Sequence, residues 1–147
     1  MAVKSGNIFF HYPEWGFELR TRSTLKAFLL SMTRKEGKKV DTINYIFCND
    51  AYLLMINQEY LGHDYYTDII TFELSESGDA LVADIFISID RVRDNSVAFK
   101  VSFKRELLRV IIHGMLHLCG YSDKSKAQKQ KMRDMEDVYL NKFLRST

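Results

Sequence analysis

The segment from Phe103 to Leu118 constrains the fold more than any other part of the chain. Its run LLRVIIHGMLHL is apolar on nearly every side of a helix, and Ser102 is well placed as the N-cap. Glu106 in the first turn favours the helix dipole, and Gly120 is expected to end the helix. Because a helix that is apolar all round is a buried helix, the other elements of the fold are expected to cover this one.

The remaining sequence predicts strands and helices that alternate early in the chain and end in a run of helices. One helical pattern begins at Ser23, its expected N-cap, and stops at Gly37. The turn SESGD separates two strands that we expect to pair as a hairpin. The expected strands cover residues 7–12, 40–48, 67–74 and 81–89, and the other expected helices cover residues 50–60, 90–100, 103–118 and 125–144. This order predicts an α+β fold, a small mixed four-stranded sheet covered by helices, with the apolar helix late in the chain.

The length of 147 residues fits a single domain over residues 1–147, long enough to bury most of its apolar surface. No run of about eighteen apolar residues is present, so no transmembrane helix is expected, and the N-terminus lacks the apolar region of a signal peptide. The two cysteines, Cys48 and Cys119, lie far apart and suit a reducing compartment. We therefore expect a cytoplasmic protein without a membrane partner.

The formal net charge of +2 does not by itself indicate a partner. Basic residues gather in three clusters that could meet phosphates, although such clusters are usually solvated helix faces. The clusters lie within residues 34–39, 100–109 and 124–133. Charge alone therefore leaves open both an RNA-binding protein and an ordinary soluble one.

Two histidines, His113 and His117, stand four residues apart on the apolar helix. Side chains at this spacing project side by side, so both imidazoles could bind one metal ion at about 2.0–2.1 Å. Each ring also needs partners for two nitrogens in an apolar setting. The alternative is that the two rings hydrogen-bond inside the core or at a sheltered edge, and the spacing leaves both interpretations open.

Asp123 is the nearest candidate for a third ligand. Gly120 permits a sharp turn that could fold Asp123 back toward the histidine pair. Two imidazoles and one carboxylate would leave a fourth position open for water, which is typical of a catalytic rather than a structural zinc site. Alternatively, Asp123 only caps the helix that begins near Ser125.

The sequence resembles the YbeY family of ribosomal-RNA maturation endoribonucleases over nearly its whole length. The stretch from His113 to Asp123, HGMLHLCGYSD, is similar to the family signature HGxLHLxGYDH, in which three histidines bind zinc. Residues 67–72 and 83–85 are similar to the family segments TDVLSF and GDI. Further similar positions are Asn57, Tyr60, Gly62 and Asp64.

The resemblance implies a single-strand-specific metallo-endoribonuclease that acts in late-stage 16S rRNA 3′-end maturation and in ribosome quality control. It also implies one zinc ion at His113, His117 and Asp123, and ribosomal RNA of the small subunit as partner, without a small-molecule cofactor. Asp123 replaces a family histidine and Ser122 a family aspartate, so the ligands would be two histidines and a carboxylate. Iron or manganese would also accept this set.

Leu61 stands where the family commonly has an arginine linked to RNA cleavage. A guanidinium can hold a phosphate by two hydrogen bonds, and a leucine cannot. His63 is the substitute that the sequence suggests. Asp84 interrupts an apolar strand and is expected either to orient a ligand histidine or to touch water. The candidate catalytic residues are therefore His113, His117, His63 and Asp84, while Asp68 and Thr71 are expected either to line a cleft or to lie at an ordinary strand edge.

Two alternatives belong to other functional classes. A non-catalytic ribosome-assembly or RNA-binding factor that contains a metal would also fit the loss of the arginine at Leu61. A zinc peptidase would share the HxxxH pattern, but zinc peptidases of the HExxH type keep a glutamate as general base where this chain has Gly114.

Overall fold

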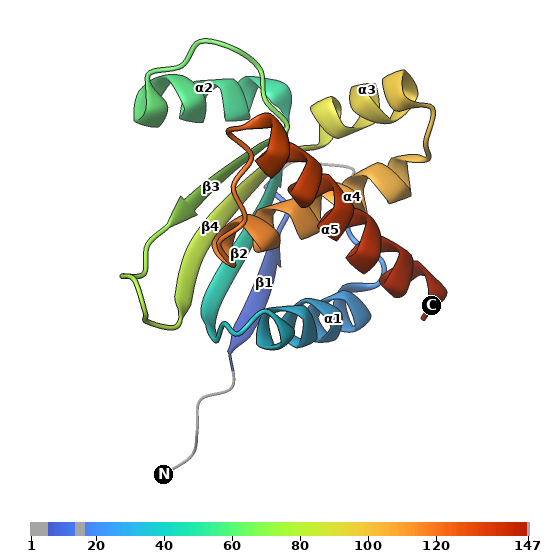
Figure 1. The fold of residues 1–147 in the computed structure, drawn as a ribbon. Helices are drawn as coiled ribbons and strands as arrows, with labels where there is room; N and C mark the ends of the chain where they lie inside the picture. The colour runs from blue at the N-terminus through green and yellow to red at the C-terminus, as the bar shows by residue number, and fades with distance from the viewer. Residues whose placement is uncertain (1–5, 14–16, 147) are drawn as a thin grey trace.

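The computed structural model of the chain describes residues 6–13 and 17–146, and its elements follow the expected order (Figure 1). The strands are β1 (Asn7–His11), β2 (Val40–Cys48), β3 (Ile69–Glu73) and β4 (Leu81–Ser88). The helices are α1 (Arg22–Lys35), α2 (Asp50–Leu61), α3 (Ile89–Phe99), α4 (Phe103–Leu118) and α5 (Lys126–Arg145). Over these described residues, no helix combines the length and apolar character needed to cross a membrane.

The strands form one four-stranded sheet in the order β1-β2-β4-β3. The first three of these are mutually parallel, and β3 pairs antiparallel with β4. The expected hairpin is confirmed, since Ile69 pairs with Ile87 and Glu73 with Ala83. The expected α+β fold with a mixed four-stranded sheet is therefore confirmed.

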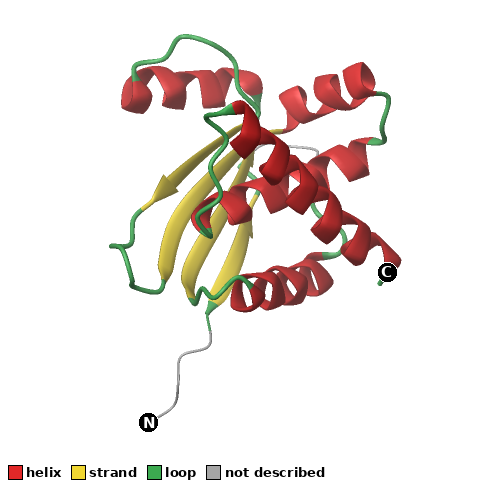
Figure 2. Ribbon diagram, viewed as in Figure 1, coloured by secondary structure: helices red, strands yellow, loops and turns green. Residues whose placement is uncertain are grey.

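The two faces of the sheet are covered unequally. On one face, side chains such as Tyr45 and Ile85 are fully buried in the main core, which includes residues of α1, α4 and α5. Figure 2 shows α2 at one end of the sheet, where Leu53 and Ile56 pack with Ile70 of β3 in a smaller cluster. This second face is only partly covered. Side chains that alternate along a strand therefore lie either in the main core or on the less covered face.

Helix α4 lies at the centre of the core, as its apolar run predicts. Ile111, Ile112 and Met115 are fully buried, and the Tyr45 hydroxyl donates a hydrogen bond of 2.9 Å to the carbonyl oxygen of Ile111. The helix is not buried on every side, however, because His117 is exposed. The open side of α4 is the one that faces the candidate site.

The helix starts agree with the sequence signals at α5 and disagree with them at α1. The expected N-cap at Ser23 is wrong, because the Leu25 amide already donates to the Thr21 carbonyl oxygen and Thr21 is the N-cap of α1. Ser125 caps α5 within a capping box. Asp123 is therefore not the cap of this helix, and its carboxylate is available to the site.

Candidate active site

A cleft of about 500 Å³ lies between α4, α5 and the start of β3. Its lining is rich in charged and titratable side chains, which is the usual character of a functional cleft. The charged or titratable side chains on the lining are Asp68, Glu106, Arg109, His113, His117, Asp123, Lys129, Arg133 and Glu136. All three predicted metal ligands thus face one cleft.

His113 is held in a defined orientation by a helix that follows it in the sequence. Its side chain is 24% exposed, and its Nδ1–H donates a hydrogen bond of 2.7 Å to Oε2 of Glu136 on α5. Because an ionised carboxylate only accepts, this bond places a proton on Nδ1. The other ring nitrogen, Nε2, lies 3.6 Å from Oδ2 of Asp123.

The distance between His113 Nε2 and Asp123 Oδ2 fits two ligands that share a metal ion. At 3.6 Å the contact is too long for a hydrogen bond. Two donors that each lie about 2.0–2.2 Å from one tetrahedral ion are about 3.4 Å apart. A carboxylate on the second nitrogen, as Glu136 provides here, is the usual partner of a ligand histidine. The donor set present therefore fits a divalent metal ion.

His117 lines the same cleft but does not converge on this point. It lies one helical turn after His113, and its side chain is exposed. Across residues 6–13 and 17–146, no group of three or more His, Cys, Asp or Glu side chains is placed to hold a metal ion. The structure brings His113 and Asp123 to ligand distance, and it does not bring His117 to them.

An ionic network beneath His113 was not expected from the sequence. Glu136 Oε1 accepts a hydrogen bond of 3.1 Å from Arg109 Nη1, and Arg109 Nη2 donates one of 2.8 Å to Asp137 Oδ1. Glu106 Oε1 lies 4.0 Å from Arg109 Nε. Both glutamates are buried, and buried charges are costly unless they are paired. The network therefore stabilises the carboxylate that orients His113.

A sequence signal for Glu136 does exist in the pattern of α5. It falls on the same helix face as Met132, Tyr139 and Phe143, all of which are buried. A carboxylate on an apolar helix face needs a partner. The partners of Glu136 are His113 and Arg109 on α4, so the spacing of residues within α5 cannot identify them.

Burial and paired charges shift the pKa values in the cleft. Burial acts to lower the pKa of His113, but the Glu136 hydrogen bond and the nearby carboxylates outweigh it, so the pKa lies above its usual value. Burial raises the pKa of Asp68, although the charge of His113 opposes the shift. Burial also raises the pKa of Glu106. The cleft thus combines a basic imidazole with carboxylates that protonate more readily than usual.

Asp84 lies on the opposite face of the sheet from His113. Strand alternation explains this position, because its neighbours Ala83 and Ile85 point into the core beneath α4. The Asp84 carboxylate instead accepts a hydrogen bond of 3.1 Å from Asn44 Nδ2. The structure does not bring Asp84 to the histidine pair, and the carboxylate that accepts a hydrogen bond from His113 is that of Glu136.

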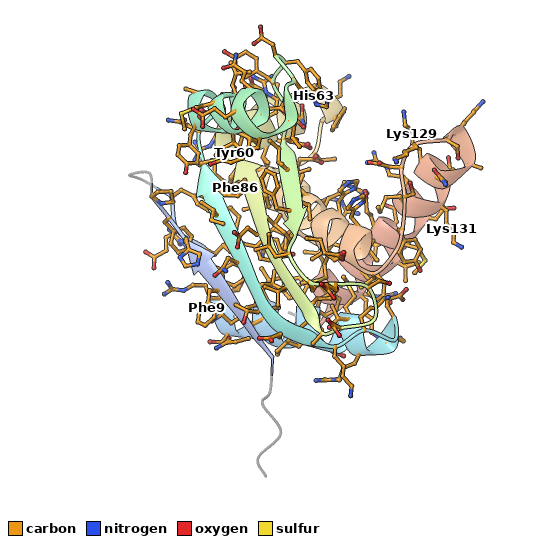
Figure 3. The ribbon with its side chains drawn as sticks, turned by 90° about the vertical axis from the view of Figure 1, so that its left-hand side faces the viewer. Phe9, Tyr60, His63, Phe86, Lys129 and Lys131 are labelled. Atoms are coloured by element: carbon orange, nitrogen blue, oxygen red, sulfur yellow. The ribbon has the colours of Figure 1, made fainter. Side chains whose placement is uncertain are left out.

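His63 lies in the exposed loop after α2 (Figure 3), where its Nδ1 is 3.0 Å from the Tyr65 hydroxyl. It is not among the residues that line the cleft, whose lining on this side begins at Thr67. Leu61, in the place of the family arginine, is exposed at the end of α2. Asp68 and Thr71, for which two roles were open, both line the cleft.

Comparison with protein families identifies the relatives of this chain. The model of the family described as Endoribonuclease YbeY matches residues 14–144. The chain belongs to this family. Endoribonuclease YbeY is a family of metal-dependent endoribonucleases, so the metal fit of His113 and Asp123 is consistent with membership.

Curated members of the Endoribonuclease YbeY family match nearly the whole chain. One from Cytophaga hutchinsonii is 46% identical over 95% of this chain and 97% of its own length. One from Flavobacterium psychrophilum is 51% identical over 92% of this chain and 96% of its own length. A solution structure of a protein from Thermotoga maritima has 27% sequence identity and a TM-score of 0.65, covering 93% of this chain and 89% of that one. The resemblance to the YbeY family is confirmed.

Proposed function

We propose that this chain is a metal-dependent endoribonuclease specific for single-stranded RNA, which acts in late 3′-end maturation of 16S rRNA and in ribosome quality control. As a member of the Endoribonuclease YbeY family it is an endoribonuclease with a role in rRNA maturation. The main structural support is the 3.6 Å separation of His113 Nε2 and Asp123 Oδ2, with His113 held by Glu136. The proposed partner is ribosomal RNA of the small subunit, and the proposed location is the cytoplasm.

His113, His117 and Asp123 are the proposed ligands of one zinc ion. Iron or manganese would also accept two imidazoles and a carboxylate. The set is supported by two donors at ligand distance and by an exposed histidine one helical turn away. A bound divalent ion would supply Lewis acidity and a water molecule of lowered pKa.

The protein's own side chains have separate roles in this function. Glu136 accepts the Nδ1–H of His113, which directs the Nε2 lone pair toward Asp123. Arg109 donates to the other oxygen of Glu136, so this buried carboxylate is paired with a cation. Asp68 lines the cleft, and burial raises the pKa of its carboxyl group.

Metal content and RNA cleavage in His113→Ala, His117→Ala and the double variant test this function. We expect each single variant to lose most of its bound metal and to cleave single-stranded RNA more than about 100-fold more slowly. His11→Ala is the matched control, because His11 lies on β1, where it donates to Asn44 instead of facing the cleft. Full metal occupancy in the double variant, measured by elemental analysis, would refute the metal site.

A non-catalytic ribosome-assembly factor is the second candidate function. The observation that favours it is the exposed Leu61 in the place of an arginine linked to cleavage. Purified, metal-loaded protein would be incubated with structured and single-stranded RNA, with and without a chelator. Binding without chelator-sensitive cleavage would support this second candidate.

Peptidase activity is disfavoured by the packing of Gly114. A methyl group at this position would lie 2.9 Å from Ile69 Cδ1 and 3.2 Å from Ile85 Cγ2, so α4 has no room for a catalytic glutamate there. We expect no hydrolysis of casein by the zinc-loaded protein. Zinc-dependent casein hydrolysis that is lost in His113→Ala would show this expectation to be wrong.

A further inference from the structure

The cleft has an acidic interior beside a basic wall. Carboxylates of Asp68, Glu106 and Glu136 lie along its interior, and Lys129 and Arg133 line it from α5. The phosphates of RNA are anionic, so a strand that reaches the histidines needs cations that are not already paired with carboxylates. The cations of the cleft differ in whether carboxylates already pair with them.

Arg109 cannot serve this purpose. Its side chain is only 12% exposed, and its three guanidinium nitrogens face Glu106, Glu136 and Asp137 at 4.0, 3.1 and 2.8 Å. A phosphate would have to displace a buried ion pair to reach it, which is costly because the carboxylates would lose their partner. Arg109 is therefore a structural cation.

Arg133 and Lys129 are placed differently. The side chain of Arg133 is 52% exposed, and its one ion pair in the described part of the chain is with Glu136 at 3.8 Å. That carboxylate already accepts hydrogen bonds from His113 and Arg109, so it retains partners when Arg133 moves. Lys129 is exposed and has no ion pair among the described residues.

Lys129 and Arg133 are also spaced to act together. They are four residues apart on α5, and side chains at this spacing lie next to each other on one helix face. Both line the cleft that contains His113 and His117. The pair therefore forms a two-cation strip along the wall opposite β3.

We propose that Lys129 and Arg133 bind the phosphodiester backbone of the RNA beside His113, which rests on the proposed endoribonuclease function. Arg133 can hold two phosphate oxygens at once through its planar guanidinium, and Lys129 acts as a point charge on a neighbouring phosphate.

Lys131 provides a matched control on the same helix. It lies two residues after Lys129 (Figure 3), but its Nζ is 5.8 Å from the centroid of the Tyr121 ring. It lines a separate hollow together with Glu36 and Cys119. Lys131→Gln thus removes the same charge from the same helix at a residue that does not line the cleft.

The salt dependence of binding to a short single-stranded DNA oligonucleotide, which has the same phosphates, tests this assignment in the metal-loaded protein. Each lost phosphate contact should reduce the slope of log K against log salt concentration by about 0.7. We expect a reduction of about 0.7 in Lys129→Gln and in Arg133→Gln, about 1.4 in the double variant, and no change in Lys131→Gln. Unchanged slope and affinity in the double variant would overturn the proposal.

A conservative substitution separates charge from structure at Arg133. Arg133→Lys restores the charge, so we expect it to recover the wild-type salt slope that Arg133→Gln loses. In RNA cleavage the double variant should raise KM at least about fivefold, with kcat within about twofold of wild type. Failure of Arg133→Lys to recover the slope would mean that Arg133 acts through structure, and its part of the assignment would fall.

Failure of this assignment is distinguishable from failure of the proposed function. If wild type cleaves single-stranded RNA and the double variant has the same KM and salt slope, the phosphate-binding role of the two-cation strip is wrong and the proposed function stands. If wild type neither binds single strands nor cleaves RNA, the function itself is wrong and the strip falls with it. Thermal melts of all variants check folding, and these exposed positions should leave Tm nearly unchanged.

Discussion

Glu136 accepts hydrogen bonds from two residues of α4, His113 and Arg109, although its own side chain is buried. In Glu136→Gln the single carboxamide oxygen can satisfy only one of these donors, so the orientation of His113 is no longer fixed. We expect the affinity for zinc to fall about 10- to 100-fold, measured by competition with a chromophoric chelator. Asp137→Asn is the control, because it weakens a contact of Arg109 but leaves the His113 bond intact. Equal zinc affinity in wild type and Glu136→Gln would contradict this role.

Asp50 is a carboxylate that accepts hydrogen bonds from two neighbouring side chains, Arg91 and Ser88. Burial acts to raise its pKa, but hydrogen bonds from Arg91 and Ser88 and the charge of Arg91 outweigh burial, so the pKa is lowered. A lowered folded-state pKa stabilises the protein above the unfolded-state value, about 3.9, and this contribution is lost as the pH falls through the folded-state value.

Arg91→Gln tests this linkage. We expect it to reduce the free energy of unfolding by about 1 kcal/mol at pH 7, with the difference from wild type shrinking toward zero in acid. Urea denaturation across pH 2–7 would measure it. Arg93→Gln is the control, because the Arg93 guanidinium lies over the Phe103 ring instead of beside Asp50. A difference from wild type that does not depend on pH would contradict the linkage.

At the scale of elements, the segment between α4 and α5 is held by a residue from the end of α1. The Tyr121 hydroxyl donates a hydrogen bond of 2.7 Å to Glu36 Oε1, and the Tyr139 hydroxyl donates to Glu36 Oε2. Tyr121 is two residues before Asp123, so this Glu36 clasp fixes the approach of the proposed ligand to His113. Gly120 makes the turn possible, with a positive φ of 108°.

Two tyrosine variants separate stability from positioning at the Glu36 clasp. Tyr121→Phe and Tyr139→Phe each remove one hydrogen bond to the same carboxylate, so each should lower the free energy of unfolding by about 1 kcal/mol in urea denaturation. Only Tyr121→Phe should also weaken zinc binding, because Tyr139 lies on α5 and not in the segment with Asp123. Equal zinc affinities in the two variants would argue against a positioning role.

The sequence predicts elements whose signals are local, and it misses contacts between elements. The bounds of β2 and α4 match the expectation, since alternation defines the strand and the Ser102 cap defines the helix start. Asp84 could not be assigned to a face, because only the packing of α4 decides which face of β4 is inward. Glu136 was missed for a similar reason, since its partners come from another helix. Local patterns determine where a helix begins, but not what its buried carboxylate contacts.

At the scale of the whole molecule, metal binding should be linked to folding. The proposed site joins α4 to the segment before α5, and an ion that binds only the folded state stabilises it by mass action. Free zinc at 100 times its Kd should raise the free energy of unfolding by about 2.7 kcal/mol, seen as a higher Tm that a chelator reverses. His113→Ala and Asp123→Ala should each remove most of this gain. A gain in both variants equal to that of wild type would contradict the site.

Cys119 lies at the C-cap of α4, next to the Glu36 clasp. Burial and the charge of Glu36 raise its pKa to about 11, so at neutral pH the thiol is almost entirely protonated. Since the thiolate is the reactive form, iodoacetamide should label Cys119 slowly while the clasp is closed and faster whenever it opens. Cys119 can therefore report on the loop beside the cleft. Its labelling rate, followed by mass spectrometry, would measure how often this loop opens.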